Sequence, residues 1–140
     1  MTSEDIVLAA RACLGTPFRH QGRIIGTALD CAGVLIQVAK AVGCNPIDVS
    51  GYGRVPANGQ LEATLDAQSD LERIADMSAR QAGDILLLRF SGEPQHLAVL
   101  TNENTIVHSY EAVGKCCEHR LSNVWAARIV RVYRFVGVTQ

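Results

Sequence analysis

The sequence of 140 residues has no long apolar segment and no excess of either charge. Its apolar stretches are far shorter than the roughly 20 residues that a membrane-spanning helix needs, so no membrane partner is expected. A formal net charge of −1 provides no attraction to nucleic acid, which excludes that class of partner as well. Residues 1–5 are acidic and lack the basic and apolar parts of a secretion signal. We therefore expect synthesis as a soluble cytoplasmic protein.

Internal repeats, low-complexity tracts and charge runs are also missing, and no change in composition marks a domain boundary. The composition, 48% hydrophobic and 19% charged, is that of an ordinary globular protein. A chain of this length buries roughly 68–70% of its unfolded surface, so it needs neither disulfides nor metal to hold a core. We predict one domain over residues 1–140 and no cofactor.

The five cysteines lack the CxxC spacing of a structural zinc site, and their odd number argues against a disulfide framework. Cys116, Cys117 and His119 form the one cluster with metal-like composition. In a strand, two neighbouring cysteines point to opposite faces and can hardly share one ion. Ordinary strand packing is the favoured interpretation, metal binding is the minor alternative, and no metal site is predicted.

The first part of the sequence has helical signals. Apolar residues at helical spacing, with acidic side chains in the first turn, predict a helix over 3–14. Asp30 is placed to cap a second helix over 31–42, which Gly43 terminates. This second helix is apolar on nearly all sides, and such a helix is normally buried.

The character of the sequence changes further on. Residues 44–59 contain two prolines and three glycines and are predicted to be loop, whereas residues 61 to about 75 have a looser helical pattern. Short runs rich in Val, Ile and Leu predict strands over 84–90, 96–100, 105–110 and 129–135. Helices followed by strands indicate an α+β domain with a mostly antiparallel sheet.

Cys31 is the first candidate for chemistry. A lone cysteine is about as often a core residue as a functional one. On the first turn of a buried helix, however, unpaired backbone N–H groups and the helix dipole favour the thiolate, and such placement lowers a cysteine pKa from about 8.5 into the range of roughly 3.5–7.5. The same amides could donate to an oxyanion. The carboxylate of Asp30 opposes the thiolate, which makes a nearby imidazolium more necessary.

His96 and His108 lie on two consecutive predicted strands. If residues 101–103 form the hairpin loop, His96 is directly opposite His108, and their Cβ atoms are about 4.5–5.5 Å apart on one face. His108 would then orient the His96 ring, in the base-and-orienter arrangement of nucleophilic triads. A four-residue loop would put the two rings on opposite faces. Taken singly, each histidine is more often structural, and neither His20 nor His119 is assigned a catalytic role.

Several short motifs follow one another in an order that is hard to obtain by chance and cover nearly the whole chain. They are Gly-Thr-Pro-Phe-Arg-His-Gln-Gly-Arg (15–23), Asp-Cys-Ala-Gly-Val-Leu (30–35), Ala-Gly-Asp-Ile-Leu (82–86), Gln-His-Leu-Ala-Val-Leu (95–100) and Ile-Val-His-Ser-Tyr (106–110). Together they resemble the NlpC-type (NlpC and p-sixty) cell-wall cysteine peptidases. The segment 125–135 is similar to the end of the phage-encoded branch of that family.

The resemblance implies a papain-like fold, with the nucleophile at the start of a central helix packed on the sheet. It implies a triad of Cys31, His96 and His108 that hydrolyses peptide bonds in the peptidoglycan stem, next to D-glutamate or diaminopimelate, without a metal. Asp30 is implied to help read the substrate, and Phe18 and Arg19 are further substrate-binding candidates.

The departures from the family pattern affect specificity more than chemistry. Phe18 stands where a tyrosine is frequent, so a hydroxyl is missing there, and Ala32 and Val34 replace a common serine and a common leucine. The phage branch implies other tail proteins as partners. Two alternatives stay open: an amidase or acyltransferase with the same triad, and a catalytically dead structural component of a phage tail.

Overall fold

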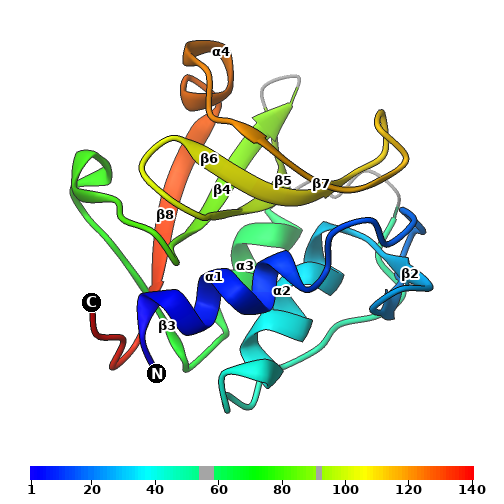
Figure 1. Ribbon diagram of the computed structural model, residues 1–140, viewed down its shortest axis with the longest axis horizontal. Helices are drawn as coiled ribbons and strands as arrows, with labels where there is room; N and C mark the ends of the chain where they lie inside the picture. The colour runs from blue at the N-terminus through cyan, green and yellow to red at the C-terminus, as the bar shows by residue number, and fades with distance from the viewer. Residues whose placement is uncertain (54–58, 91–92) are drawn as a thin grey trace.

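The structure, a computed structural model, describes residues 1–53, 59–90 and 93–140. Most helices precede the long strands along the chain (Figure 1). The elements are α1 (Ser3–Arg11), β1 (Arg23–Ile24), β2 (Ala28–Leu29), α2 (Cys31–Ala41), α3 (Gln60–Asp66), β3 (Leu71–Arg73), η1 (Met77–Ala79), β4 (Ile85–Phe90), β5 (Glu93–Leu100), β6 (Thr105–Tyr110), β7 (Lys115–Arg120), α4 (Asn123–Ala126) and β8 (Ile129–Phe135).

Six strands form one sheet in the order β3-β8-β4-β5-β6-β7, and each neighbouring pair is antiparallel. The short strands β1 and β2 form a separate two-stranded sheet beside the start of α2. Figure 1 shows α1 and α2 next to each other along one side of the large sheet, and α4 at its far end. The predicted α+β class with an antiparallel sheet and a packed central helix is confirmed.

The strands place alternate side chains in two hydrophobic clusters, as the twofold period of a strand requires. Ile85 and Leu87 of β4 pack with residues of α1, α2 and α3, whereas Leu86 and Leu88 belong to a second cluster that includes Trp125. All four leucine and isoleucine side chains are fully buried. Each such burial stabilises the fold by about 1.5–3 kcal/mol, so the sheet is fixed between two apolar layers.

One predicted element is wrong in its second half. The helical pattern over residues 61–75 becomes the helix α3 only as far as Asp66, and Leu71–Arg73 form the edge strand β3. There Leu71 pairs with Phe135 of β8, and the backbone N–H of Ile74 donates to Val132. The apolar residues satisfy a helical period by coincidence, because pairing with a distant strand outweighs a weak local pattern.

The other predicted elements have nearly the expected bounds. The helices predicted over 3–14 and 31–42 end at Arg11 and Ala41, and Gly43 follows the second with a φ of 86°, a left-handed conformation that favours glycine. The strand predicted over 96–100 begins earlier, at Glu93. Residues 44–53 of the predicted loop have no regular structure, and 54–58 lie outside the described residues.

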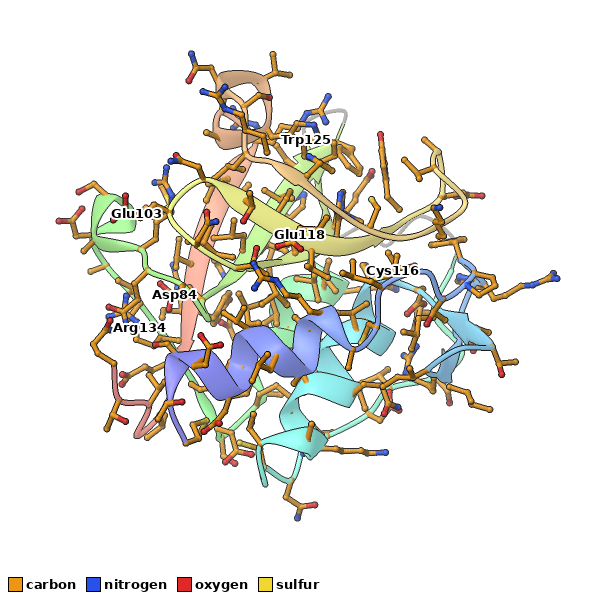
Figure 2. All side chains as sticks on the ribbon, in the orientation of Figure 1. Asp84, Glu103, Cys116, Glu118, Trp125 and Arg134 are labelled. Atoms are coloured by element: carbon orange, nitrogen blue, oxygen red, sulfur yellow. The ribbon has the colours of Figure 1, made fainter. Side chains whose placement is uncertain are left out.

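The end of the sheet away from Trp125 is tied by an ion pair. The guanidinium of Arg134 in β8 donates to both carboxylate oxygens of Asp84, at 2.9 Å each, and Asp84 is 1% exposed. Figure 2 shows the two side chains beside each other, far from Trp125. None of the helices in the described residues has the length and apolar character that a bilayer span requires.

Candidate active site

Cys31 is the first residue of α2, and the local sequence explains why a helix begins there. Asp30 has extended backbone angles, and its carboxylate accepts from the backbone N–H of Gly33 at 2.8 Å, which is an N-cap as predicted. Gly33 is required by space, because a Cβ atom would lie 2.2 Å from the carbonyl oxygen of Gly22. The Asp-Cys-Ala-Gly motif therefore has a physical basis: a cap, a thiol on the first turn, and a close approach of the preceding loop.

The Asp30 carboxylate is also the centre of a hydrogen-bond network. In addition to the cap, it accepts from the Arg23 guanidinium at 2.8 Å, from the backbone N–H of Gln21 at 2.9 Å, and from the hydroxyl of Tyr52. Arg23 donates in turn to the Tyr52 hydroxyl at 2.8 Å. Gln21 has a φ of 61°, a left-handed backbone conformation, and its backbone N–H donates to Asp30. The network holds the loop 18–23 against the start of α2.

The Cys31 thiol is not activated in the way that the sequence suggested. Its pKa is raised to about 12, first by burial and then by the carboxylate of Asp30. Hydrogen bonding from the backbone of Leu97 and Ala32 acts in the opposite direction but is outweighed. The expected lowering of the pKa is therefore wrong, because desolvation of the thiolate and the charge of Asp30 outweigh the backbone hydrogen bonds and the charge of Arg23. The thiol is neutral at neutral pH.

His96 and His108 lie together, although not in the predicted register. Val99 pairs with Val107 and Leu100 with Ile106, which makes residues 102–104 the loop and sets His108 opposite Ala98 instead of His96. The shift is two residues, so both rings stay on one face and meet diagonally. Nε2 of His96 is 2.6 Å from Nδ1 of His108. The expected contact exists, and the predicted pairing of the two residues across the strands is wrong.

Both rings are buried and uncharged. The pKa of His96 is lowered well below its usual value by burial, with smaller contributions from His108 and Arg128. The pKa of His108 is lowered to about 3, again mainly by burial and then by His119. His96 is 5% exposed and His108 is not exposed at all. The rings are therefore neutral imidazoles at neutral pH, each with one donor and one acceptor nitrogen.

A cavity of about 700 Å³ opens between the loop 18–23, the loop 47–52 and the ends of β4, β5 and β6. Cys31 and His96 both line it, and so do Asp30 and Tyr52. Of the other substrate-binding candidates, Phe18 also lines it. Arg19 is exposed and lies outside the lining, so the geometry provides no support for its predicted role.

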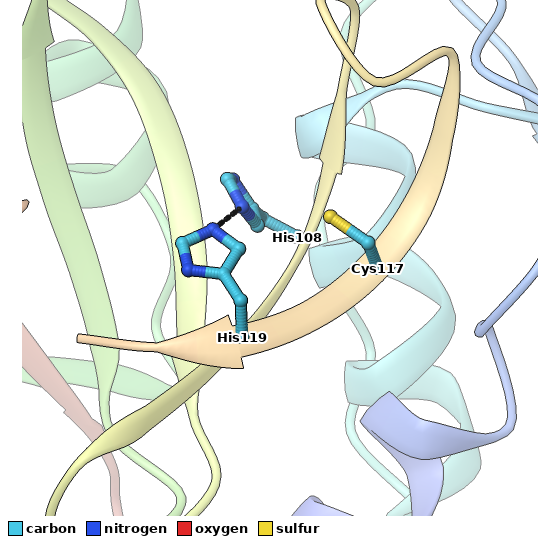
Figure 3. Close-up of side chains that lie close together, drawn as sticks. All are labelled: His108, Cys117 and His119. Atoms are coloured by element: carbon cyan, nitrogen blue, oxygen red, sulfur yellow. Dashed lines mark hydrogen bonds between the residues drawn. The ribbon is translucent and has the colours of Figure 1, made fainter. Parts of the chain in front are cut away.

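His108, Cys117 and His119 form a second cluster, outside the residues that line the cavity (Figure 3). Cys117 and His119 lie on one face of β7, whereas Cys116 is buried on the other, so the predicted opposition of the two cysteines is confirmed. The ligand atoms of the three residues are within 4.8 Å of one another, but Nε2 of His108 and Nε2 of His119 are only 2.7 Å apart. Two nitrogens on one tetrahedral zinc ion, each bound at about 2.0–2.1 Å, are separated by roughly 3.3 Å. The cluster is therefore hydrogen-bonded and not arranged around a metal.

Two residues of the site were missed by the sequence reasoning. Tyr52 lies in a segment predicted only as loop, and nothing in its neighbours marks it as a partner of Asp30. His119 has polar neighbours in the sequence, and they give no sign of a catalytic role. Its i, i+2 spacing from Cys117 on a possible strand was the available signal, but the neighbouring strand β6 had to be known before His108 could be recognised as its partner.

A cysteine at the start of a buried helix that packs on an antiparallel sheet is the arrangement that defines the papain-like fold. The sequence matches the NlpC/P60 family over residues 15–134, and the chain belongs to that family. The predicted family is thereby confirmed. The match does not bear on the phage-encoded branch, and no curated protein matches the sequence.

Solved structures of the family have this fold at low sequence identity. An NlpC/P60 family protein from Bacillus cereus has a TM-score of 0.72 at 16% identity, over 97% of this chain and 41% of that chain. The NlpC/p60 domain of the peptidoglycan hydrolase SagA has a TM-score of 0.66 at 18% identity, over 94% of this chain and 97% of that domain. The peptidoglycan hydrolase RipB from Mycobacterium tuberculosis has a TM-score of 0.65 at 14% identity, over 96% and 64%. The chain thus spans less than half the length of the Bacillus cereus protein.

Proposed function

We propose that this domain is a cysteine endopeptidase that hydrolyses peptide bonds in the peptidoglycan stem, next to D-glutamate or diaminopimelate. The observation that carries the proposal is the presence of Cys31 and His96 on the wall of one cavity, with His96 hydrogen-bonded to His108. Family membership and the names of the solved peptidoglycan hydrolases SagA and RipB support the substrate class.

The reaction is an acyl transfer in which Cys31 and His96 are both neutral before the substrate is attacked. His96 accepts the thiol proton of Cys31 as the sulfur attacks the scissile carbonyl, and the backbone N–H of Cys31 donates to the oxyanion. His96 then gives the proton to the leaving amine, and water hydrolyses the thioester. Because the thiol pKa is raised and the imidazole pKa is lowered, proton transfer accompanies attack on the bound substrate and does not precede it.

Substrate recognition is proposed for the residues on the cavity wall. Asp30 provides a negative charge there, and the Tyr52 hydroxyl bonded to it is placed to share in the recognition of a polar group on the stem peptide. Phe18 offers an apolar surface. Association with other phage tail proteins is the finer part of the proposal, and the similarity of segment 125–135 to the phage-encoded branch supports it.

The test is digestion of purified muropeptides, followed by mass spectrometry of the products. Cys31→Ala and His96→Ala are expected to reduce turnover by at least about 100-fold, since each removes a reacting group. Cys44→Ala, which lies outside the cavity lining, is the matched control and should keep the wild-type rate. Wild-type turnover in either site variant would overturn the assignment. Products cut at another bond would indicate an amidase or acyltransferase, and a folded, inactive wild type would indicate the structural role.

The pH dependence tests the neutral pair. A lowered pKa keeps His96 unprotonated below pH 6.5, so kcat/KM should stay level through that pH and fall only in more acidic solution. The raised thiol pKa implies slow alkylation of Cys31 by iodoacetamide at pH 7 in the absence of substrate. Fast alkylation that persists down to pH 5 would show a preformed thiolate and contradict this mechanism.

A further inference from the structure

The hydrogen-bond chain that begins at His96 does not end at His108. Nε2 of His108 is 2.7 Å from Nε2 of His119, and Nδ1 of His119 is 2.9 Å from the backbone carbonyl oxygen of Arg120 (Figure 3 shows the bond between the two rings). Three imidazoles from β5, β6 and β7 are therefore joined in series to one backbone oxygen. Trp125 packs beside the last two, with ring centroids 5.1 Å from each.

The carbonyl at the end of the chain gives it a direction. A carbonyl oxygen can only accept, so Nδ1 of a neutral His119 carries the proton and its Nε2 is an acceptor. His108 must then donate from Nε2 and accept at Nδ1. His96 in turn donates from Nε2, and its Nδ1 is left with a free lone pair. Each step has one solution, because every nitrogen–nitrogen contact needs one donor and one acceptor.

We propose that His119 is a positioning residue that sets the tautomer of His96 through His108, and thereby keeps Nδ1 of His96 free to accept the Cys31 proton. This inference rests on the proposed function, because a free Nδ1 matters to catalysis only if His96 is the base. It adds a fourth residue to the three that the resemblance implied. Neither His108 nor His119 is among the residues that line the cavity, so His119 acts without touching the substrate.

Two substitutions at His119 distinguish an effect on the donor–acceptor order of the hydrogen-bond chain from an effect on packing alone. The side-chain oxygen of glutamine can accept from Nε2 of His108, and its amide can donate to the Arg120 carbonyl, so His119→Gln preserves the order of the chain. A lysine ammonium has only donors, so His119→Lys forces His108 to accept at Nε2. His108 then donates from Nδ1 to Nε2 of His96, and the proton of His96 moves to Nδ1, where it blocks the base.

The kinetic test measures kcat and KM of both variants on the stem peptide. We expect His119→Gln to stay within about threefold of the wild type, and His119→Lys to lose roughly 100-fold or more in kcat with KM unchanged. Lys115→Gln, an exposed change on the same strand, is the control. Equal activity of the folded Gln and Lys variants would overturn the proposal, and so would a loss confined to KM.

The spectroscopic test needs no substrate and no variant. In ¹⁵N-labelled wild-type protein at neutral pH, ring ¹⁵N shifts should report the proton on Nε2 of His96, on Nε2 of His108 and on Nδ1 of His119. A proton on Nδ1 of His96 would overturn the proposed order even if the enzyme is active. Conversely, the expected pattern in a protein that cleaves no peptide would support the hydrogen-bond order and refute the proposed function, so the two failures are distinguishable.

Discussion

The loop before α2 and the strand group β5–β7 both bury polar side chains, but they satisfy them in different ways. In the loop, the Asp30 carboxylate is surrounded by donors, one of them the charged Arg23. In the strands, His96 and His108 are uncharged, with lowered pKa values, and their nitrogens bond to one another. A buried carboxylate needs opposite charge and several donors, whereas buried imidazoles need only a consistent order of protons.

The difference predicts different weaknesses. Loss of one member of the charged network leaves its partner buried without an opposite charge or a hydrogen bond. Substitutions in that network should therefore lower the free energy of unfolding. The histidines need no charged partner while they are neutral, and their protonation is opposed by burial, so their contribution to stability should depend on pH. Three predictions, from the largest effect to the smallest, test this contrast.

The largest effect is expected for Asp30→Ala. It removes the helix cap and the partner of Arg23 together, and we expect the free energy of unfolding to fall by about 3 kcal/mol at pH 7. Urea unfolding measures it. Asp30→Asn is the matched control, because it keeps an oxygen for the cap and should lose about half as much. A loss below 1 kcal/mol for the alanine variant would show that the network does not hold the loop.

The second effect is the acid sensitivity of His108. The pKa of His108 is about 3 in the folded protein and about 6.5 in the unfolded chain. Between these two pH values the unfolded chain is protonated and the folded ring is not, so stability falls as the pH is lowered through this window. From this ring alone the loss between pH 8 and pH 5 is about 2 kcal/mol. His108→Gln keeps a donor and an acceptor but does not titrate, so the loss should shrink by that amount.

Urea unfolding at pH 8 and pH 5 checks this, with Lys115→Gln as the control for an exposed change on the neighbouring strand. The control should retain the full wild-type difference between the two pH values. If His108→Gln retains it as well, the acid sensitivity comes from other groups and the contrast between the two regions is weakened.

The smallest effect is expected for Tyr52→Phe. It removes one hydroxyl that bridges Asp30 and Arg23, while the direct ion pair remains, and we expect a loss of about 1 kcal/mol. Tyr110→Phe is a fitting comparison, because the Tyr110 hydroxyl has no hydrogen-bond partner among the described residues, and it should change stability by less than 0.5 kcal/mol. Equal losses in a thermal unfolding experiment would mean that the bridge contributes nothing specific.

Local sequence was sufficient for the helix that carries Cys31. Asp30 and Gly43 mark its two ends by cap chemistry that involves only neighbouring residues, and its apolar composition predicts burial. The residues 61–75 were different, because half of an equally plausible helical pattern joined the edge of the sheet. A local period fixes an element only where no distant strand competes for the same backbone.

His96 and His108 show the same limit of local sequence information within one site. A three-residue loop predicted that His96 and His108 share a face, and the observed shift of two residues preserves that face. It did not reveal which residues pair, because the turn at 102–104 sets the register. Nor did it reveal that burial would raise the pKa of Cys31 despite the helix dipole.

The sequence by itself determined the family, the fold class and the capped helix that starts at Cys31, and it singled out His96 and His108. These follow from motif order, from residues adjacent in the chain and from the period of a strand. The tertiary structure alone decided the partners of Asp30, the neutral state of the thiol and the joining of His119 to the chain. Those depend on desolvation and on contacts between segments that only folding brings together.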